Sequence, residues 1–583
     1  MRYHTLAVTV LATALAVAGP TARQAPYRTL NDTFDPPRVA DPKTWGRRAE
    51  HLREHILASA GLMPLPERTP LQPRIFGEVK HADYAVSKVY FQSLPGFLVT
   101  GNLYRPAGDG PFPAILSPHG HWAYGRLENT ALASVPGRAI NLARQGFVVF
   151  SYDMIGYVDS QQIPHTFGGR REHLWGLSLA GLQLWNAIRA LDFLETLPYV
   201  RRDAIGATGA SGGGTQTFLL AAVDPRVAVA APVNMISLHM QGGCLCENPP
   251  GLRLDTTNVE LAASIAPRPL LMVSATGDWT KNTLEHEYPA VRQIYTLLGA
   301  PDRVHAVRFE ADHNYHRESR EAMYAWMARW LQDAPADVRR PERSFSPGAP
   351  ADLLVFHMRP VPAGLVTPSE LTHNWIAAAR RQLAASPPEV AARALRHVLG
   401  FADPRPSPAG VSAPARKKAV LVAGTDPALD EHLRAAGFAV HPIAFTPFDH
   451  GAAGRIRHFE TYNRTAASQR VADIVKAVQS NPGAAVVAAG DAALAGLLAA
   501  AIAAPPVAVL DVDRFDSTGD EGFLERLYIP GLRRAGDLQT AAAMYAGRLA
   551  IHNAGLEFTL AGVTSRQTRM TPQEIGQLLL SAR

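Results

Sequence analysis

The stretch "AIGATGASGGGTQTFLLAA", residues 204–222, decides the fold of the first half of the chain. Five glycines surround a single serine, Ser211, between a short apolar run and a run that favours a helix. This pattern predicts a buried strand, a sharp turn at Gly209-Ala210-Ser211 and a helix directly after it. A G-x-S-x-G serine in such a strand–turn–helix setting is held exposed above a sheet as a nucleophile. Small residues are needed around it because the turn brings strand and helix close together.

The sequence on both sides of this stretch alternates between short apolar runs and helical patterns. Two strands of antiparallel character come first, at 81–94 and 96–106, and later runs each end in a polar or glycine-rich tip. Strands that alternate with helices predict a mostly parallel sheet flanked by helices, with the chemistry beyond the carboxyl ends of the strands. The fold class predicted is therefore α/β, an α/β-hydrolase fold followed by a second α/β domain.

A chain of 583 residues is too long for one hydrophobic core, and Pro-rich seams divide it. The predicted parts are a signal peptide (1–18), an N-terminal arm (19–75), a catalytic domain (76–335), a helical and Pro-rich linker (336–416) and a second α/β domain (417–583). The net charge of +6 is small and its basic residues are scattered, which argues against nucleic acid as a partner.

The first residues carry one arginine, then an apolar run at 6–17 and the small-x-small tripeptide Ala16-Val17-Ala18. This is the pattern of a secretory signal peptide, and the run is too short to span a membrane. We expect a periplasmic or secreted mature chain with no membrane attachment after cleavage. The oligomeric state is left open.

Acyl transfer by a serine requires a base and an acid that holds the base in place. Two predicted strands after Ser211 end in Asp278 and His313, in the chain order Ser, Asp, His that this fold uses. We predict Ser211 as nucleophile, Asp278 as acid and His313 as base. Glu247 is an alternative acid after an intervening strand, and His316 is a weaker alternative base.

The loop "SPHGHW", residues 117–122, follows an earlier strand and has the form of an oxyanion-hole loop. The predicted donors are the backbone N–H groups of Gly212 and His121. Trp122 and Trp279 flank the predicted catalytic loops and are candidate substrate-binding residues. Trp175 also falls near the predicted site, whereas the helical pattern around Trp185 predicts a core residue.

The insertion at 157–176 is predicted to form a lid, in which His165, Arg170 and Arg171 are candidates to meet an anionic substrate. A solvated loop is the alternative for these side chains.

The chain has two cysteines, Cys244 and Cys246, in "QGGCLCENPP". Two ligands do not make a closed zinc site, and a disulfide within C-x-C is strained. Two packed thiols are therefore the preferred interpretation. No metal or organic cofactor is predicted, because covalent serine catalysis needs none.

The motifs HGHW, SYDMIGYVDS, GATGASGGGTQTF and ADHNYH resemble those of secreted bacterial α/β-hydrolases of the acetyl xylan esterase-like, dienelactone hydrolase-related group, over roughly residues 84–331. The resemblance implies carboxylic ester hydrolysis, with a small-molecule or polysaccharide ester as substrate and O-acetyl groups of plant polysaccharide as the first expectation. It supports Ser211, Asp278 and His313. Glucuronoyl esterases, a related group, carry an Arg where Gly212 stands here. A serine peptidase of the prolyl oligopeptidase type and a small-ester or lactone hydrolase are the alternatives.

The second α/β domain resembles the tandem half of larger relatives in a degenerate form. At its would-be elbow, "VVAAGDAALAGLL", the chain reads Gly490-Asp491 with no serine at the nucleophile position. His552 follows a later predicted strand but has no nucleophile to serve. A structural or binding role is therefore expected for this domain.

Overall fold

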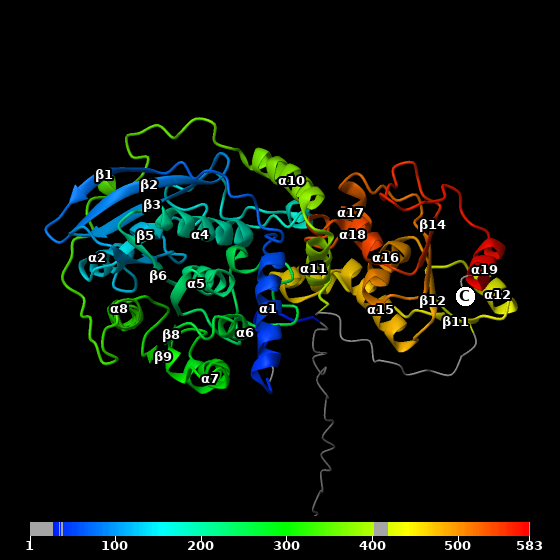
Figure 1. Ribbon diagram of the computed structural model, residues 1–583, viewed down its shortest axis with the longest axis horizontal. Helices are drawn as coiled ribbons and strands as arrows, with labels where there is room; N and C mark the ends of the chain where they lie inside the picture. Colours follow the sequence, from blue (N-terminus) through cyan, green and yellow to red (C-terminus); the bar gives the residue numbers. More distant parts are fainter. Residues whose placement is uncertain (1–26, 34, 36–38, 402–417, 582–583) are drawn as a thin grey trace, which may run out of the picture.

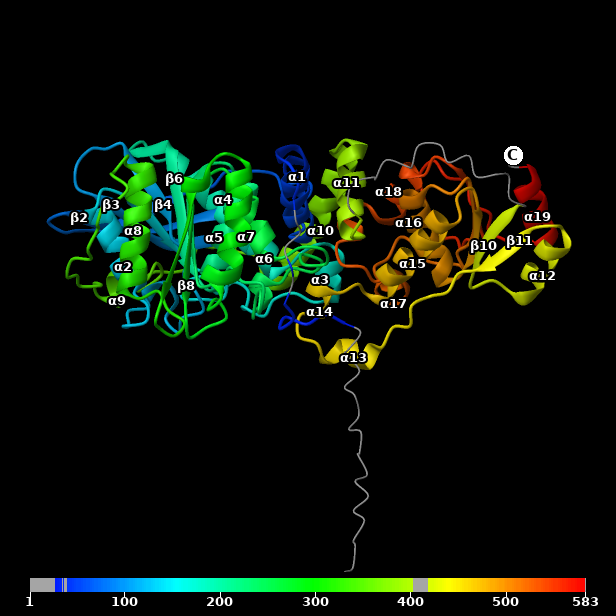
Figure 2. The ribbon, with the colours of Figure 1, turned by 90° about the horizontal axis from the view of Figure 1, so that it is seen from below.

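The computed structural model describes residues 27–33, 35, 39–401 and 418–581, so the predicted signal peptide lies outside the described residues. Two α/β lobes lie side by side along the long axis of the molecule, and helices α1 (Pro42–Ser59), α10 (Pro368–Ala385) and α11 (Pro388–Val398) lie between them (Figures 1 and 2). The predicted linker thus contributes two of the helices that join the lobes.

The first lobe is built on a nine-stranded sheet with the order β1-β2-β3-β5-β4-β6-β7-β8-β9. The strands β1 to β3 form an antiparallel ribbon, β3 joins β5 in antiparallel fashion, and the strands from β5 to β9 run parallel. This confirms the predicted α/β-hydrolase fold. The strands are Arg74–Lys80 (β1), Tyr84–Leu94 (β2), Phe97–Pro106 (β3), Phe112–Leu116 (β4), Val148–Tyr152 (β5), Val200–Ala210 (β6), Val227–Val233 (β7), Leu270–Ala275 (β8) and Val304–Phe309 (β9).

Helices cover both faces of this sheet, and the buried apolar side chains form one layer on each face. One layer is closed by α2 (Val135–Arg144) and α8 (Arg317–Leu331). The other is closed by α4 (Leu179–Glu195), α5 (Gly212–Val223), α6 (Asn258–Ala263) and α7 (Tyr288–Leu297), with α1 packed outside them. Because it lies between the sheet and other helices, α5 is apolar and buried along almost its whole length.

The second lobe has five parallel strands in the order β11-β10-β12-β13-β14, which repeats the order β5-β4-β6-β7-β8 of the first lobe. Within residues 418–581 no strand corresponds to β9, which precedes His313 in the first lobe. The strands are Ala419–Ala423 (β10), Ala439–Pro442 (β11), Ala485–Ala489 (β12), Val507–Asp511 (β13) and Arg548–His552 (β14). The helices are Pro427–Ala435 (α12), Ala466–Ser480 (α15), Asp491–Ala503 (α16), Asp537–Met544 (α18) and Pro572–Ser581 (α19).

Short helices of the first lobe and of the second lobe meet at the contact between them. They are Arg170–Leu174 (α3), Phe459–Tyr462 (α14) and Glu521–Arg526 (α17). Two further short helices are Pro350–Leu353 (α9) and His450–Arg455 (α13). Arg171 of α3 pairs with Asp520 at 2.8 Å, and the indole N–H of Trp175 donates to the same carboxylate at 2.9 Å. Arg170 stacks over Tyr528 with its guanidinium carbon 4.1 Å from the ring centre. These side chains contact the second lobe, and Arg170 also lines a groove beside it, so their contact with an anionic substrate stays a prediction.

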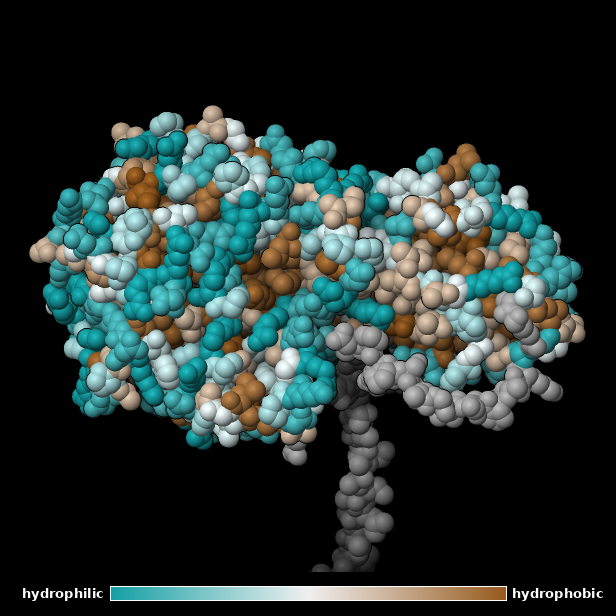
Figure 3. Space-filling model, viewed as in Figure 1, coloured by the Kyte–Doolittle hydropathy of each residue, from teal (hydrophilic) through white to brown (hydrophobic). Residues whose placement is uncertain are grey.

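The surface seen in Figure 3 mixes hydrophilic side chains with scattered apolar areas on both lobes. Among the helices of the described residues, none has the length and apolar character that crossing a bilayer requires.

Candidate active site

Ser211 stands where strand β6 turns into helix α5, with φ = 58° and ψ = −125°. Its N–H donates to the carbonyl of Val233 at the end of β7, at 3.0 Å, and its own carbonyl accepts from Thr215 at 3.0 Å. A non-glycine residue at this positive φ is strained and persists only where the surroundings impose it. Ser211 therefore stands at the strained strand–helix turn where the sequence predicts a nucleophile.

The glycines around Ser211 are required by close backbone contacts. A Cβ at Gly209 would lie 2.6 Å from the carbonyl oxygen of Pro118, and one at Gly213 would lie 2.7 Å from that of His119. A Cβ at Gly120 would lie 2.7 Å from the carbonyl oxygen of Ala210. The loop after β4 thus crosses directly against the turn, at the position predicted for the oxyanion hole.

His313 and Asp278 form a hydrogen-bonded pair. Nδ1 of His313 donates to Oδ2 of Asp278 at 2.8 Å, while Oδ1 of Asp278 accepts from the backbone N–H of Thr280 at 2.7 Å. With the proton on Nδ1, the basic nitrogen is Nε2, which is buried without a hydrogen-bond partner among the described residues. The bond from a serine to its base often forms only when substrate is bound. The predicted base is therefore oriented by the predicted acid, with its second nitrogen available for a proton.

The two alternatives to this pair are engaged elsewhere. Oε2 of Glu247 accepts from the N–H groups of Gly243 at 2.7 Å and Cys244 at 2.9 Å, which closes its own loop. Nδ1 of His316 accepts from the N–H of Ser319 at 3.2 Å and caps helix α8. The structure pairs His313 with Asp278.

Two tryptophans flank the His313 ring. The ring centres of Trp279 and Trp122 lie 4.5 Å and 5.9 Å from that of His313, each tilted by 31°. Substrate contact by this pair stays a prediction. Trp185 is a core residue, as predicted, and donates to the carbonyl of Ser93 at 2.9 Å. Trp175 lies at the contact between the lobes and not at the site, so its placement near the site was wrong.

His119 orients the predicted oxyanion loop, a role that the sequence analysis missed. Its Nε2 accepts from the N–H of Met154 at 2.9 Å, which places the ring proton on Nδ1, and Nδ1 donates to the carbonyl of Gly120 at 2.7 Å. Burial lowers the pKa of His119 to about 3, so the ring is neutral. The Gly120 carbonyl and the His121 N–H belong to one planar peptide group, so fixing the first fixes the second. The signal in the sequence was the H-G-H pattern itself.

A buried arginine supports the same loop from helix α2. The guanidinium of Arg138 donates to the hydroxyl of Ser117 at 2.9 Å and to the carbonyl of Pro118 at 3.1 Å. Arg138 also lies over the ring of Tyr315, 4.6 Å from its centre. Burial lowers the pKa of Arg138 from its usual value.

Beside the elbow, the structure gathers four side chains able to bind a metal. The donor atoms of His121, His165, Cys244 and Cys246 all lie within 4.8 Å of one another. The sequence analysis expected two packed thiols alone; both cysteines are free, and two imidazoles complete the cluster. The neighbouring side chains of Cys246, His121 and His165 lower the pKa of the Cys244 thiol far below its usual range, against the opposing effect of burial.

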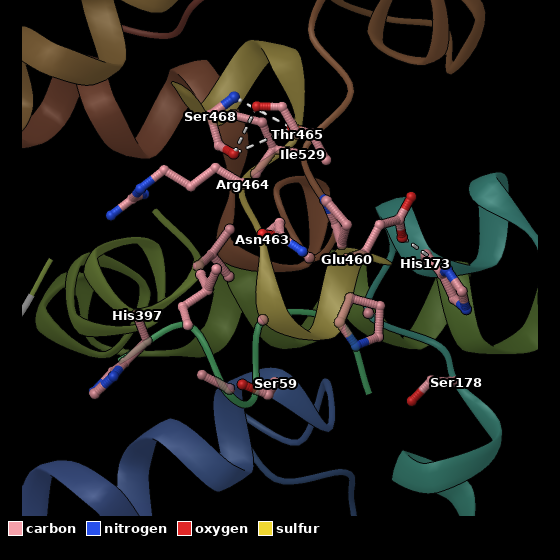
Figure 4. Close-up of a pocket in the computed structure, with 18 residues that line it drawn as sticks. Ser59, His173, Ser178, His397, Glu460, Asn463, Arg464, Thr465, Ser468 and Ile529 are labelled. Carbon is pink, nitrogen blue, oxygen red and sulfur yellow. Dashed lines mark hydrogen bonds and ion pairs between the residues drawn. The ribbon is translucent and has the colours of Figure 1, made fainter. Parts of the chain in front are cut away.

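A second feature of the molecule is a small cavity between the lobes, shown in Figure 4. It has a volume of about 30 Å³, and Ser59, His173, His397, Glu460 and Arg464 are among its lining residues. This volume holds a water molecule or two and not a sugar. A larger groove of about 930 Å³ runs nearby, between Arg170, Leu245 and His458. The second lobe thus forms one wall of a space that begins next to the cysteine loop.

The known proteins that this chain resembles are hydrolases. Residues 96–270 match the X-Pro dipeptidyl-peptidase (S15) family. A Bacillus subtilis (strain 168) protein named as a hydrolase, YtaP, is 25% identical over 242 residues, which is 38% of this chain and 80% of that protein. Among solved structures, Methylesterase BT1017 is 32% identical with a TM-score of 0.45, over 50% of this chain and 66%, just under two thirds, of that one.

A solved protein of Bacteroides fragilis NCTC 9343, described as an acetyl xylan esterase, is 17% identical with a TM-score of 0.40. That similarity covers 59% of this chain and 90% of the other. The family match and the Bacillus subtilis relative, together with the sheet order, the strained serine elbow and the oriented histidine already described, identify the chain as an enzyme, a hydrolase with an α/β-hydrolase fold.

Proposed function

We propose that this chain hydrolyses carboxylic esters through an acyl-enzyme on Ser211, and that its substrates are esters carried by carbohydrate. The observation that carries the proposal is the strained Ser211 elbow in the same lobe as the His313–Asp278 pair, at the carboxyl ends of parallel strands. A serine is a weak nucleophile unless a base takes its proton, and this arrangement supplies an oriented base.

In the acylation step, Nε2 of His313 takes the hydroxyl proton as Ser211 Oγ attacks the ester carbonyl. The negative charge on the carbonyl oxygen is stabilised by the N–H groups of Gly212 and His121. His313 then gives its proton to the leaving alcohol oxygen. Water repeats the sequence on the acyl-enzyme and releases the acid. Asp278 stays ionised and stabilises the imidazolium that forms in both steps.

The carbohydrate part of the proposal rests on the sequence resemblance and on the aromatic side chains beside His313. Flat indole faces such as those of Trp122 and Trp279 suit stacking against sugar rings, and the groove beside the second lobe has a volume of about 930 Å³. O-acetyl groups of plant polysaccharide are the first substrate class we propose. A periplasmic or secreted location is part of the same proposal.

The family match favours a second candidate, a serine peptidase that removes dipeptides ending in proline. Such an enzyme must bind the free α-ammonium group of the peptide, which calls for an available carboxylate. Glu247 is already bound to two backbone N–H groups, and Asp153 is bound to Thr100 and Arg126. Neither carboxylate is free for this task, which favours the esterase.

The test is a substrate panel with the native chain and with Ser211→Ala: p-nitrophenyl acetate, acetylated xylan, methyl-esterified pectin and an Ala-Pro anilide. We expect acetate release from the first two substrates by the native chain and none by the variant. Methanol release from pectin without acetate release from the other esters would support ester hydrolysis but show that the substrate is a methyl ester and not an acetate. Cleavage of the anilide without ester hydrolysis would establish the peptidase instead.

A further inference from the structure

The cluster of His121, His165, Cys244 and Cys246 is assembled from three loops that surround the nucleophile. His121 belongs to the loop after β4, His165 to the insertion after β5, and both cysteines to the loop after β7. Residues from three separate loops do not converge through local turn geometry. Their convergence on one point is a property of the tertiary structure and needs an explanation of its own.

The His165 ring is prepared as a ligand. Its Nδ1 donates to the carbonyl of Ile155 at 2.6 Å, so the lone pair is on Nε2. That Nε2 is buried and has no hydrogen-bond partner among the described residues. A metal-binding histidine almost always donates its other ring N–H to a carbonyl or carboxylate, which fixes the tautomer and the ring orientation. His165 shows this arrangement, and its Nε2 lies within 4.8 Å of the donor atoms of His121, Cys244 and Cys246.

The distances suit a tetrahedral metal ion. Zinc with bonds of about 2.3 Å to sulfur and about 2.0–2.1 Å to nitrogen holds neighbouring ligand atoms roughly 3.3–3.8 Å apart. Nε2 of His121 lies 3.1 Å from Sγ of Cys246, and all four donor atoms lie within 4.8 Å of one another. Closing the set around an ion therefore requires movements of at most about 1 Å.

We propose that this cluster binds one zinc ion through Cys244, Cys246, His121 and His165. Two thiolates and two imidazoles are the donor set of closed structural zinc sites, and with four protein ligands no coordination position is left for substrate. On binding, both sulfurs coordinate as thiolates, and any proton that a thiol still holds leaves to solvent. Cys246 is buried while Cys244 is partly exposed, which gives the ion a path of entry.

A disulfide is the less favourable use of these thiols. A C-x-C disulfide closes a strained ring, and it leaves the lone pair of His165 buried and unused. The loop is also held in its present form by Glu247, whose carboxylate accepts from the N–H of Cys244 at 2.9 Å. The zinc site satisfies both imidazoles and both sulfurs at once.

The zinc also has a consequence for catalysis, and this part rests on the proposed function. A Cβ built on Gly212 would lie 2.6 Å from Cε1 of His121, so the His121 ring packs directly on the residue after the nucleophile. Holding that ring on a metal fixes the His121 backbone N–H, the second oxyanion donor. The ion thus positions the oxyanion hole without touching substrate.

The experiment measures zinc in untagged chain purified under reducing conditions, equilibrated with zinc sulfate and dialysed. The variants are Cys244→Ser and His165→Gln, and the matched control is His51→Gln. His51 belongs to a separate group with His55 and His397, which is the other candidate metal cluster of the described residues. We expect one zinc per chain in the native protein and in the control, and less than a tenth of that in the two variants.

Replacing zinc with cobalt provides a second readout, because a thiolate–cobalt charge-transfer band appears only if sulfur is a ligand. Zinc that is lost from His51→Gln but retained in Cys244→Ser would overturn the proposal in favour of the histidine cluster. Native chain that takes up no zinc, or that contains a Cys244–Cys246 disulfide resistant to zinc uptake, would also overturn it. Removal of zinc is expected to lower kcat on p-nitrophenyl acetate about tenfold with little change in KM. The measured zinc content tests the site whether or not this ester is a substrate.

Discussion

The two lobes contain two elbows with the same backbone and different chemistry. Ser211 has φ = 58° and ψ = −125°, and Gly490 at the end of β12 has φ = 61° and ψ = −135°. The N–H of Ser211 donates to the last carbonyl of β7, from Val233, and that of Gly490 to the last carbonyl of β13, from Asp511. The elbow is therefore a feature of this strand–helix unit and does not depend on catalysis.

The neighbouring loops also correspond. A Cβ on Gly120 would lie 2.7 Å from the carbonyl oxygen of Ala210, and one on Gly424 would lie 2.8 Å from that of Ala489. In both lobes the loop that follows the corresponding strand, β4 or β10, contacts the backbone just before the elbow residue. A Cβ on Gly490 would meet nothing within 4 Å, so space for a side chain exists there. The second lobe therefore has the backbone geometry of the elbow without a hydroxyl at this position.

The difference lies in the side chains that make a hydroxyl reactive. In the second lobe, Asp511 is bound by Asn553 at 2.7 Å and Arg569 at 2.8 Å, and His552 accepts from the N–H of Met570 at 3.2 Å. No strand equivalent to β9 follows in residues 418–581, so no base corresponds to His313. Backbone geometry is thus retained by packing, whereas catalysis requires a base, which this lobe lacks.

The largest effect is expected at Ser211, the elbow residue by which the first lobe differs from the second. Ser211→Ala should lower kcat/KM at least about 10⁴-fold, because the nucleophile is lost while the fold stays intact. The reciprocal change, Gly490→Ser, supplies a hydroxyl without a base and should add no activity to Ser211→Ala. Initial rates on p-nitrophenyl acetate, with circular dichroism as the control for folding, measure both. Recovery of activity in the double variant would contradict the assignment of the second lobe as inactive.

The second prediction concerns the residue after each elbow. Gly212→Ala places a methyl group 2.6 Å from Cε1 of His121, which must push the ring and its loop away. We expect a loss in kcat of roughly 10²-fold, the usual cost of one oxyanion donor. The matched change in the second lobe is Asp491→Ala, which should leave kcat unchanged. Equal losses in the two variants would mean that the effect is one of stability.

The third prediction concerns His397, between the lobes, and the pH dependence of the free energy of unfolding. Burial and the nearby His55 and His51 lower the pKa of His397 to about 3, whereas an unfolded histidine titrates near 6.5. Below pH 6.5 the unfolded chain binds the proton and the folded chain does not, so this histidine lowers the free energy of unfolding as the pH falls. Between pH 8 and pH 5 the loss is about 2 kcal/mol.

In urea unfolding, His397→Asn should therefore lose about 2 kcal/mol less than the native chain over this range. Because His397 is on α11 and packs on α1, this also tests whether the joining helices unfold together with both lobes. An unchanged pH dependence in the variant would show that His397 is protonated in the folded chain.

The smallest effect is expected at the lobe contact itself. Arg171→Ala removes one ion pair to Asp520, but the Arg171 side chain is 58% exposed and Asp520 keeps its bond from Trp175. We expect the free energy of unfolding to fall by less than about 1 kcal/mol. A loss of several kcal/mol, or two separate unfolding transitions, would show that this pair couples the lobes.

Much of the fold follows from local pattern. Alternating strands and helices predicted the α/β-hydrolase sheet, and polar residues at strand ends predicted Ser211, Asp278 and His313, because parallel strands present their carboxyl ends at one edge. The same pattern predicted a second α/β lobe, and the family resemblance predicted that its elbow has Gly490 and no serine. It placed Trp175 near the site, whereas Trp175 lies at the contact between the lobes, because nothing local shows that the insertion after β5 packs on another lobe.

The sequence by itself determined the order in which Ser211, Asp278 and His313 follow the strands along the chain, and with it the class of reaction. Only the tertiary structure decided which distant side chains meet. His119 orients the oxyanion loop through Met154, and His121 and His165 join Cys244 and Cys246 from three different loops. The reason is physical: periodicity reports which face of an element is buried, whereas the meeting of loop side chains depends on how the whole sheet brings its strand ends together.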